Sequence, residues 1–177
     1  EIYNGLARAW QVVLAHINEA MEMTGITKNG KTKSAGAKSA LLSAFWGTEL
    51  RFFNQVLTLM QMPSVIADIR KNLEAGKSIV VQLVNTNEAN MERQIENNQQ
   101  EEGDLDDLDL TPRDALMQFL EKSFPTQQME EYTDEQGNIR TRPVTDSADN
   151  PVENPDAVKL KEEMLLQVGS LKVPEGP

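Results

Sequence analysis

The sequence predicts an α/β protein that is predominantly helical, with an inserted β-hairpin in its C-terminal half. Apolar residues recur at steps of three and four over most of residues 3–76, which is the helical period. One short β-branched run, residues 79–84, is typical of a strand that is buried on both faces. We expect four segments: a helical segment 1–76, a strand and helix 77–97, an acidic linker 98–110, and a helix, β-hairpin and helix 111–177.

The N-terminal segment is predicted to contain three helices. The first spans residues 3–24 and ends at Gly25, since glycine tolerates the left-handed conformation that often follows a helix. The second runs from 34 to 62, and Pro63 then allows a third helix that Gly76 closes. The expected buried stripes are Leu6, Trp10, Val13, Ile17 and Met21; then Leu41, Phe45, Phe52, Val56, Leu59 and Met60; and finally Val65, Ile66, Ile69 and Leu73.

The C-terminal segment carries local signals for each of its elements. Thr111, Pro112 and Asp114 supply an N-cap, a proline at the first helical position and an acid in the first turn. Residues 128–133 and 138–144 flank a Gly-containing turn and predict a β-hairpin. Asn154 should cap a last helix, whose apolar stripe is Ala157, Leu160, Met164, Val168 and Leu171.

The composition narrows the possible classes of protein. Cysteine is absent and His16 is the single histidine, so a disulfide framework and a typical His-based zinc site are not expected. No apolar run approaches the roughly 20 residues that span a bilayer, and no signal peptide is visible. We therefore expect a cytoplasmic protein without a membrane contact, and we expect the chain to be a piece of a longer protein.

Charge is distributed unevenly along the chain. The net charge is −11, but residues 1–85 carry 9 Lys and Arg against 6 Asp and Glu, whereas residues 86–177 carry 8 against 22. The positive half contains a lysine cluster with two interpretations, a phosphate contact or a solvated loop between helices. Its members are Lys28, Lys31, Lys33 and Lys38. The aromatic residues around Arg51 could stack on bases, although their helical spacing favours a helix core.

Catalytic motifs are absent from the sequence. It contains no Gly-rich phosphate loop of Walker type, no nucleophile elbow and no HExxH pair. Carboxylates are numerous, but pairs such as Asp106 and Asp107 fall in the predicted linker, where burial would not raise a pKa for acid–base work. We expect neither a catalytic residue nor a metal site within this chain.

Two segments, FWGTELRFFNQV and GKSIVVQLVNTNEA, resemble strawberry-notch-type superfamily-2 helicases where the first RecA-like lobe joins the second. The family pattern there runs approximately FWxxHQRFF and then GKxVVIGLQSTGEA. The matching residues are Phe45, Trp46, Arg51, Phe52, Phe53, Gly76, Lys77, Val80, Val81, Leu83, Thr86, Glu88 and Ala89. Glu49 and Leu50 stand where the pattern has His-Gln, and Asn87 stands where it has Gly.

Three later segments, LDLTPRDALMQFLEKSFP, EEYTDEQGNIRTRPV and VPEGP, are similar to the phage- and bacteria-associated branch of the same family. The resemblance implies a partial RecA-like C-terminal helicase lobe in which residues 79–84 are the first strand. Asn85, Thr86 and Asn87 would then follow this strand, either contacting the nucleic-acid backbone or capping the next helix. Arg51 and the lysine cluster are further candidate contacts.

The resemblance also implies what the parent protein needs. It would bind ATP and Mg between its lobes through motifs that lie outside this chain, and its partners would be DNA and the remaining helicase lobes. The chain itself would be a non-catalytic part without its own cofactor. The alternatives are a protein–protein interaction module of a phage or mobile-element protein, in which the helices and the acidic half bind a protein, and a structural protein of that origin.

Overall fold

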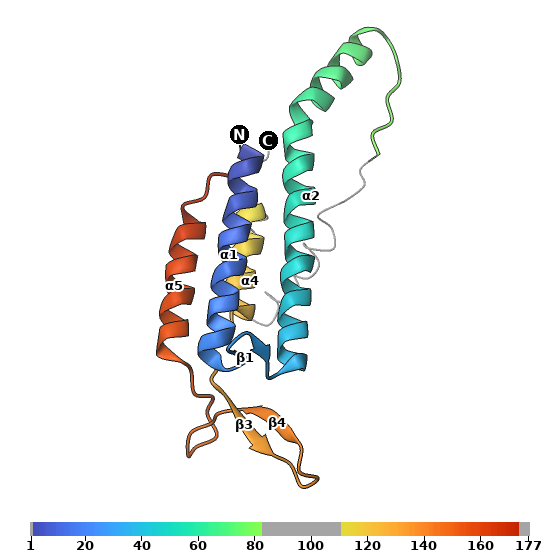
Figure 1. Cartoon of the computed structure of the whole chain (residues 1–177). Helices are drawn as coiled ribbons and strands as arrows, with labels where there is room; N and C mark the ends of the chain where they lie inside the picture. Colours follow the sequence, from blue (N-terminus) through green and yellow to red (C-terminus); the bar gives the residue numbers. More distant parts are fainter. Residues whose placement is uncertain (1, 83–110, 174–177) are drawn as a thin grey trace. The chain divides into compact units, whose positions relative to one another are not determined.

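The computed structural model describes residues 2–82 and 111–173, which are mostly helical with two small antiparallel hairpins (Figure 1). The chain divides into two compact units. The first comprises Glu1–Glu49 and Leu116–Lys172, and the second comprises Leu50–Ala115 and Val173–Pro177. None of the helices in the described ranges is long and apolar enough to cross a membrane.

The helix α1 spans Ile2–Thr24 and forms the centre of the first unit. Its five predicted stripe residues are all buried, with at most 2% of their surface exposed. The Thr24 hydroxyl donates to the Ala20 carbonyl at 2.7 Å, and Gly25 follows with a φ of +81°. The predicted helix and its end are therefore confirmed.

The helix α2 spans Ala35–Glu74 and continues through Pro63. The predicted division into two helices is wrong, because a proline removes one backbone hydrogen bond and bends a helix without always ending it. The helix does end at the predicted glycine. Gly76 has a φ of +73°, its N–H donates to the Leu73 carbonyl at 2.9 Å, and the Lys77 N–H donates to the Asn72 carbonyl at 3.0 Å. These two bonds form a Schellman motif.

The apolar stripe residues of α2 have different outcomes before and after Val56. Leu41, Phe45, Phe52 and Val56 are buried as expected. Met60, by contrast, is 44% exposed and Leu73 is 58% exposed. The helical period is thus correct throughout, whereas full burial of the predicted stripe residues is confirmed only as far as Val56.

The described part of the predicted buried strand, residues 79–82, is not in a strand. Val80 is 95% exposed and Val81 is 51% exposed. A strand of this composition is stable only between neighbouring strands, and no described segment pairs with it. Residues 83 and 84 lie outside the described residues, as do the predicted helix after them and the acidic linker.

The C-terminal elements follow their local signals. The helix α4 spans Pro112–Ser123. The Thr111 N–H donates to Asp114 Oδ2 at 3.1 Å, and the Asp114 N–H donates to Thr111 Oγ1 at 3.3 Å, which is a capping box. The strands β3, Met129–Thr133, and β4, Ile139–Pro143, form the predicted hairpin.

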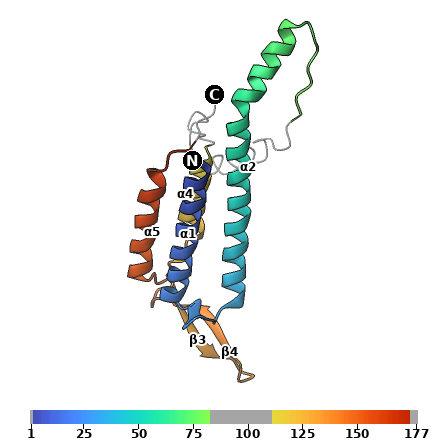
Figure 2. The same ribbon diagram turned by 45° about the horizontal axis from the view of Figure 1, so that its top comes forward.

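The last helix, α5, spans Pro155–Gly169 and buries four of its five predicted stripe residues. Asn154 caps it, accepting from the backbone N–H groups of Asp156 and Ala157. The Asn154 amide also donates to the Met23 carbonyl at 3.1 Å and to Gln128 Oε1 at 3.0 Å. One side chain therefore joins the start of α5 to the end of α1, and these two helices lie side by side in Figures 1 and 2.

Candidate nucleic-acid interface

The lysine cluster lies on and after a small hairpin that follows α1 in the first unit. Its strands are β1, Thr27–Lys28, and β2, Lys31–Thr32. Asn29 and Gly30 form the turn with φ values of +49° and +73°, and positive φ at both central positions defines the hairpin turn of type I′. Sequence reasoning placed a loop here and missed the hairpin, although an Asn-Gly pair is a strong hairpin signal.

The turn is held by Glu22, which lies in the last turns of α1 and was not expected to have a role. Thr27 Oγ1 donates to Glu22 Oε2 at 2.7 Å, and the Asn29 N–H donates to Glu22 Oε1. These bonds favour the ionised carboxylate, the Thr27 hydroxyl most strongly, and they lower the pKa of Glu22 below its ordinary value. A carboxylate on α1 thus fixes the shape of a hairpin whose exposed side chains are basic.

Lys28 and Lys31 face each other directly across this hairpin and are both exposed. None of the ion pairs formed by the described residues involves either of them. Like charges directly opposite each other on a hairpin repel and destabilise it. A bound anion would relieve that repulsion, so the pair is suited to a phosphate group.

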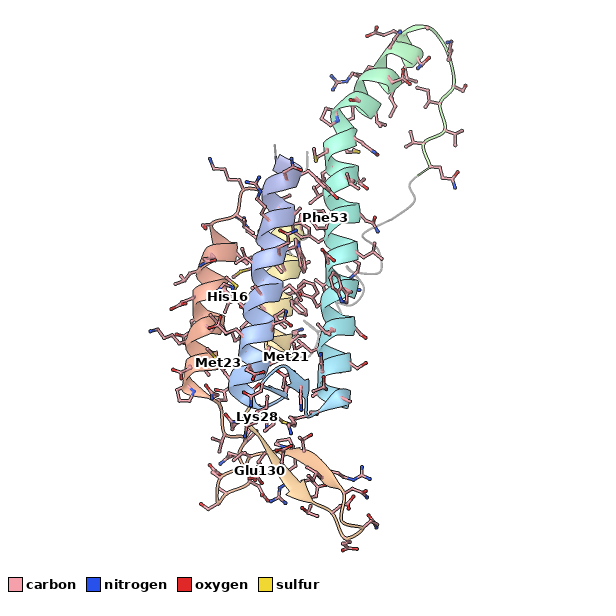
Figure 3. All side chains as sticks on the ribbon, viewed as in Figure 1. His16, Met21, Met23, Lys28, Phe53 and Glu130 are labelled. Atoms are coloured by element: carbon pink, nitrogen blue, oxygen red, sulfur yellow. The ribbon has the colours of Figure 1, made fainter. Side chains whose placement is uncertain are left out.

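The other two lysines of the cluster already have partners. Lys33 Nζ forms an ion pair with Glu131 on β3 at 3.0 Å, and Lys38 Nζ donates to Thr32 Oγ1 at 3.2 Å. Lys33 therefore connects the first hairpin to the second, and Lys38 supports β2 from the first turns of α2. Figure 3 shows Lys28 at the end of α1 and Glu130 on the neighbouring β3.

Four other residues were also predicted to contact nucleic acid. Arg51 is exposed on α2 and belongs to the second unit. Asn85, Thr86 and Asn87 lie outside the described residues. The structure therefore brings together Lys28, Lys31, Lys33 and Lys38, and it leaves the expectation for the loop after residue 84 as a prediction.

The second hairpin carries two arginines that are held by acids. Arg140 Nε donates to Asp134 Oδ2 at 2.6 Å, and Arg142 Nε donates to Glu130 Oε1 at 2.7 Å. Arg142 also lies over the Tyr132 ring, 5.0 Å from its centre. The Arg140 guanidinium, assisted by the Asn138 N–H, holds the pKa of Asp134 below its ordinary value. Because carboxylates compensate both arginines, Lys28 and Lys31 remain the better candidates for an anion.

A shallow depression of about 280 Å³ lies in the same unit, next to β1. Its lining is apolar except for one serine. The lining residues are Ile26, Ala37, Ala40, Leu41, Ala44, Ser123 and Pro125. Acid–base or nucleophilic chemistry needs titratable groups near the reacting atoms, and this lining supplies none. In residues 2–82 and 111–173, no group of three or more histidine, aspartate or glutamate side chains could hold a metal ion.

Comparison with known proteins finds distant relatives. The chain is 24% identical over 169 residues to human protein strawberry notch homolog 1, covering 94% of this chain and 11% of that protein. It is 26% identical over 139 residues to FORGETTER 1 of Arabidopsis thaliana, covering 78% of this chain and 10% of that protein. It is 24% identical over 125 residues to strawberry notch of Drosophila melanogaster, covering 71% of this chain and 7% of that protein.

These similarities involve most of this chain and about a tenth of each relative's length. No protein-family model matches the chain, and no solved structure matches it significantly. The chain is thus similar at a distance to strawberry notch proteins.

Proposed function

We propose that this chain is a non-catalytic part of a DNA-dependent, strawberry-notch-type helicase-like protein of the phage and bacterial branch. It would lie between the first and second RecA-like lobes, contribute to their packing and contact nucleic acid. The distant similarity over 71–94% of the chain supports this proposal. The two segments that resemble the family, around Phe45 and around Val80, also support it. The first of these segments contains Phe45 and Phe52, which are among the largest buried side chains.

In this proposal, ATP and Mg bind to other parts of the parent protein. This chain offers no Gly-rich phosphate loop, and its described residues gather no acidic group that would fit a metal ion. We propose that the chain itself does not hydrolyse ATP. The parent would act in the cytoplasm on DNA, with the remaining helicase lobes of the same polypeptide as its neighbours.

The Lys28 and Lys31 pair is the observation on which the nucleic-acid contact depends. The type I′ turn places Lys28 and Lys31 opposite each other in the hairpin, and the Glu22 carboxylate accepts hydrogen bonds from Thr27 and Asn29 of that hairpin. Two neighbouring lysines can neutralise backbone phosphates, which gives affinity without reading sequence. This mode of binding weakens as the salt concentration rises, because the release of counterions from the DNA then becomes less favourable.

Fluorescence anisotropy with labelled single-stranded and double-stranded DNA tests the contact. We expect binding by the full chain to weaken as salt rises from 50 to 200 mM, because phosphate contacts release counterions. Lys28→Glu with Lys31→Glu should weaken binding at least tenfold at low salt and flatten the salt dependence. The matched control, Lys159→Glu with Lys172→Glu, changes the net charge equally at two exposed lysines outside the hairpin and should retain most of the binding.

Equal losses in the two double variants would mean that only net charge matters, and the hairpin would lose its assigned role. An absence of DNA binding in the unmodified chain would favour the alternative function, an interaction module of a phage or mobile-element protein. The exposed apolar residues Leu50 and Leu57 on α2 favour that alternative, since such residues often mark surfaces for protein contact.

A further inference from the structure

The part of α2 in the second unit carries several apolar side chains that are partly or largely exposed. Leu50 is 65% exposed, Leu57 is 42% exposed and Met60 is 44% exposed, while Phe53 is half-buried. These four residues follow one another at steps of three, four and three, so they lie on one face of the helix. We call them the open face of α2.

The open face lies beside a second apolar stripe on the same helix. Phe52 and Val56 are 1% and 0% exposed, and the Phe52 and Phe53 rings meet edge to face with centres 5.2 Å apart. A helix that buries one side normally carries charged or polar residues around the rest of its surface. Here the apolar surface continues past the buried stripe, which indicates that a second element covers it.

The spacing of the open face indicates which kind of element fits. Apolar residues at alternating steps of three and four form the narrow seam into which another helix inserts its side chains. The exposed neighbours Arg51 and Gln61 are polar and would lie at the border of such a contact. A helix with its own apolar stripe is therefore the partner of matching chemistry.

The size of the open face argues against a stable pair of identical chains. From Leu50 to Met60 the helix rises only about 15 Å. Four partly exposed side chains offer a few hundred Å² at most, whereas stable complexes of separate proteins bury roughly 1,200–2,000 Å² in total. A small contact is sufficient when both sides belong to one polypeptide, because the linkage raises the effective concentration to about the millimolar range.

We propose that the open face of α2 is the docking site for an amphipathic helix from another part of the same, longer polypeptide. This inference rests on the proposed function, in which the chain is one piece of a larger helicase-like protein. The relatives provide room for such a helix, since the chain aligns with only 7–11% of their length.

Site-specific photo-cross-linking in the full-length protein tests the proposal. Benzoylphenylalanine at Leu57 should cross-link to a helix elsewhere in the same polypeptide, identified by mass spectrometry. Benzoylphenylalanine at Leu166 is the matched control, because this leucine is 78% exposed on α5 and is not part of the open face. A cross-link from Leu57 to a second copy, or no cross-link above that control, would overturn the proposal.

Hydrogen exchange provides a second test on folded material. Amides of residues 50–60 should exchange about tenfold more slowly in the full-length protein than in the 177-residue chain. Leu50→Glu with Leu57→Glu should remove this difference in the full-length protein while leaving the melting temperature of the 177-residue chain nearly unchanged, as surface substitutions do. Equal exchange in both proteins would contradict the proposal.

The two hypotheses fail separately. Suppose that the full-length protein gives the cross-link from Leu57 but neither binds DNA nor hydrolyses ATP. This result would refute the proposed function and support the docking site. DNA-dependent ATP hydrolysis in a full-length protein without that cross-link would refute only the docking site.

Discussion

The helix α1 and the last part of α2, from residue 63 to its end, carry similar apolar stripes and have different environments. Every predicted stripe residue of α1 is at most 2% exposed, whereas Val65 and Leu73 of α2 are 38% and 58% exposed. Both segments are helical, and both have apolar residues at the helical period. The difference teaches that periodicity predicts a helix and its apolar face, while burial depends on whether the same chain supplies something to cover that face.

The largest expected effect comes from a matched pair of substitutions in the two halves of α2. Phe45 is 1% exposed, and its ring lies against Trp10 and Phe119 with centres 5.2 and 5.9 Å away. Phe45→Ala should lower the free energy of unfolding by about 3–5 kcal/mol, through lost burial and the cavity it leaves. Leu73→Ala should change it by no more than about 0.5 kcal/mol, because Leu73 is already exposed.

Urea denaturation followed by far-UV circular dichroism measures both free energies. Leu166→Ala on α5, at a leucine that is 78% exposed, is the control for removing a surface leucine from a helix. If Leu73→Ala lowered the free energy of unfolding nearly as much as Phe45→Ala, the contrast between α1 and the end of α2 would be wrong. Such a result would mean that the chain itself covers the end of α2.

Two glycines with similar backbone angles sharpen the comparison at the helix ends. Gly25 after α1 and Gly76 after α2 have φ values of +81° and +73°. An added Cβ at Gly25 would lie 3.1 Å from the Met129 carbonyl oxygen, whereas at Gly76 it would meet nothing within 4 Å. Gly76→Ala should therefore cost about 1–2 kcal/mol for the positive φ alone. Gly25→Ala should cost about 1–3 kcal/mol more for the crowding.

Thermal and urea denaturation of the two variants gives these differences directly. Gly36→Ala, in the first turn of α2, is the control: it has neither a positive φ nor a neighbour within 4 Å, and alanine there should be neutral or stabilising. Equal decreases in the free energy of unfolding for Gly25→Ala and Gly76→Ala would show that β3 shifts at little cost. The end of α1 would then be no more tightly packed than the end of α2.

Local signals were sufficient to predict much of the fold. The Thr111 and Asp114 capping box, the Asn154 cap and the turn at Gly137 each depend on residues close in sequence, and each forms as expected. Contacts between distant segments had no such signal. The Asn154 amide reaches the Met23 carbonyl across 131 residues, and nothing in either local sequence specifies that pairing.

The candidate site was predictable only in part. The lysines were found by composition, and the Asn29-Gly30 pair would have revealed their hairpin. The role of Glu22 was not predictable, because a glutamate on a helix gives no sign that it will accept bonds from a later turn. The predicted strand failed over residues 79–82 for the same reason as the distal half of α2, since a buried strand also needs neighbours.

The smallest expected effect concerns Glu22 and is confined to the β1–β2 hairpin. Its pKa lies below the ordinary value because the ionised carboxylate accepts from Thr27 and Asn29. A lowered pKa in the folded state means that the carboxylate stabilises the hairpin fully above the ordinary glutamate pKa of about 4.3, and that this contribution disappears as the pH falls through the lowered value. The turn that holds Lys28 opposite Lys31 should therefore loosen in acid.

A pH titration followed by NMR would detect this through the Asn29 amide. Its chemical shift should change with a midpoint below the ordinary glutamate value, and Glu22→Gln should abolish that change while leaving the overall melting temperature within a few degrees. A midpoint at or above the ordinary value would show that the carboxylate does not support the turn. In that case α1 would not determine the conformation of the hairpin that carries Lys28 and Lys31. The proposed DNA contact would then lose its structural basis.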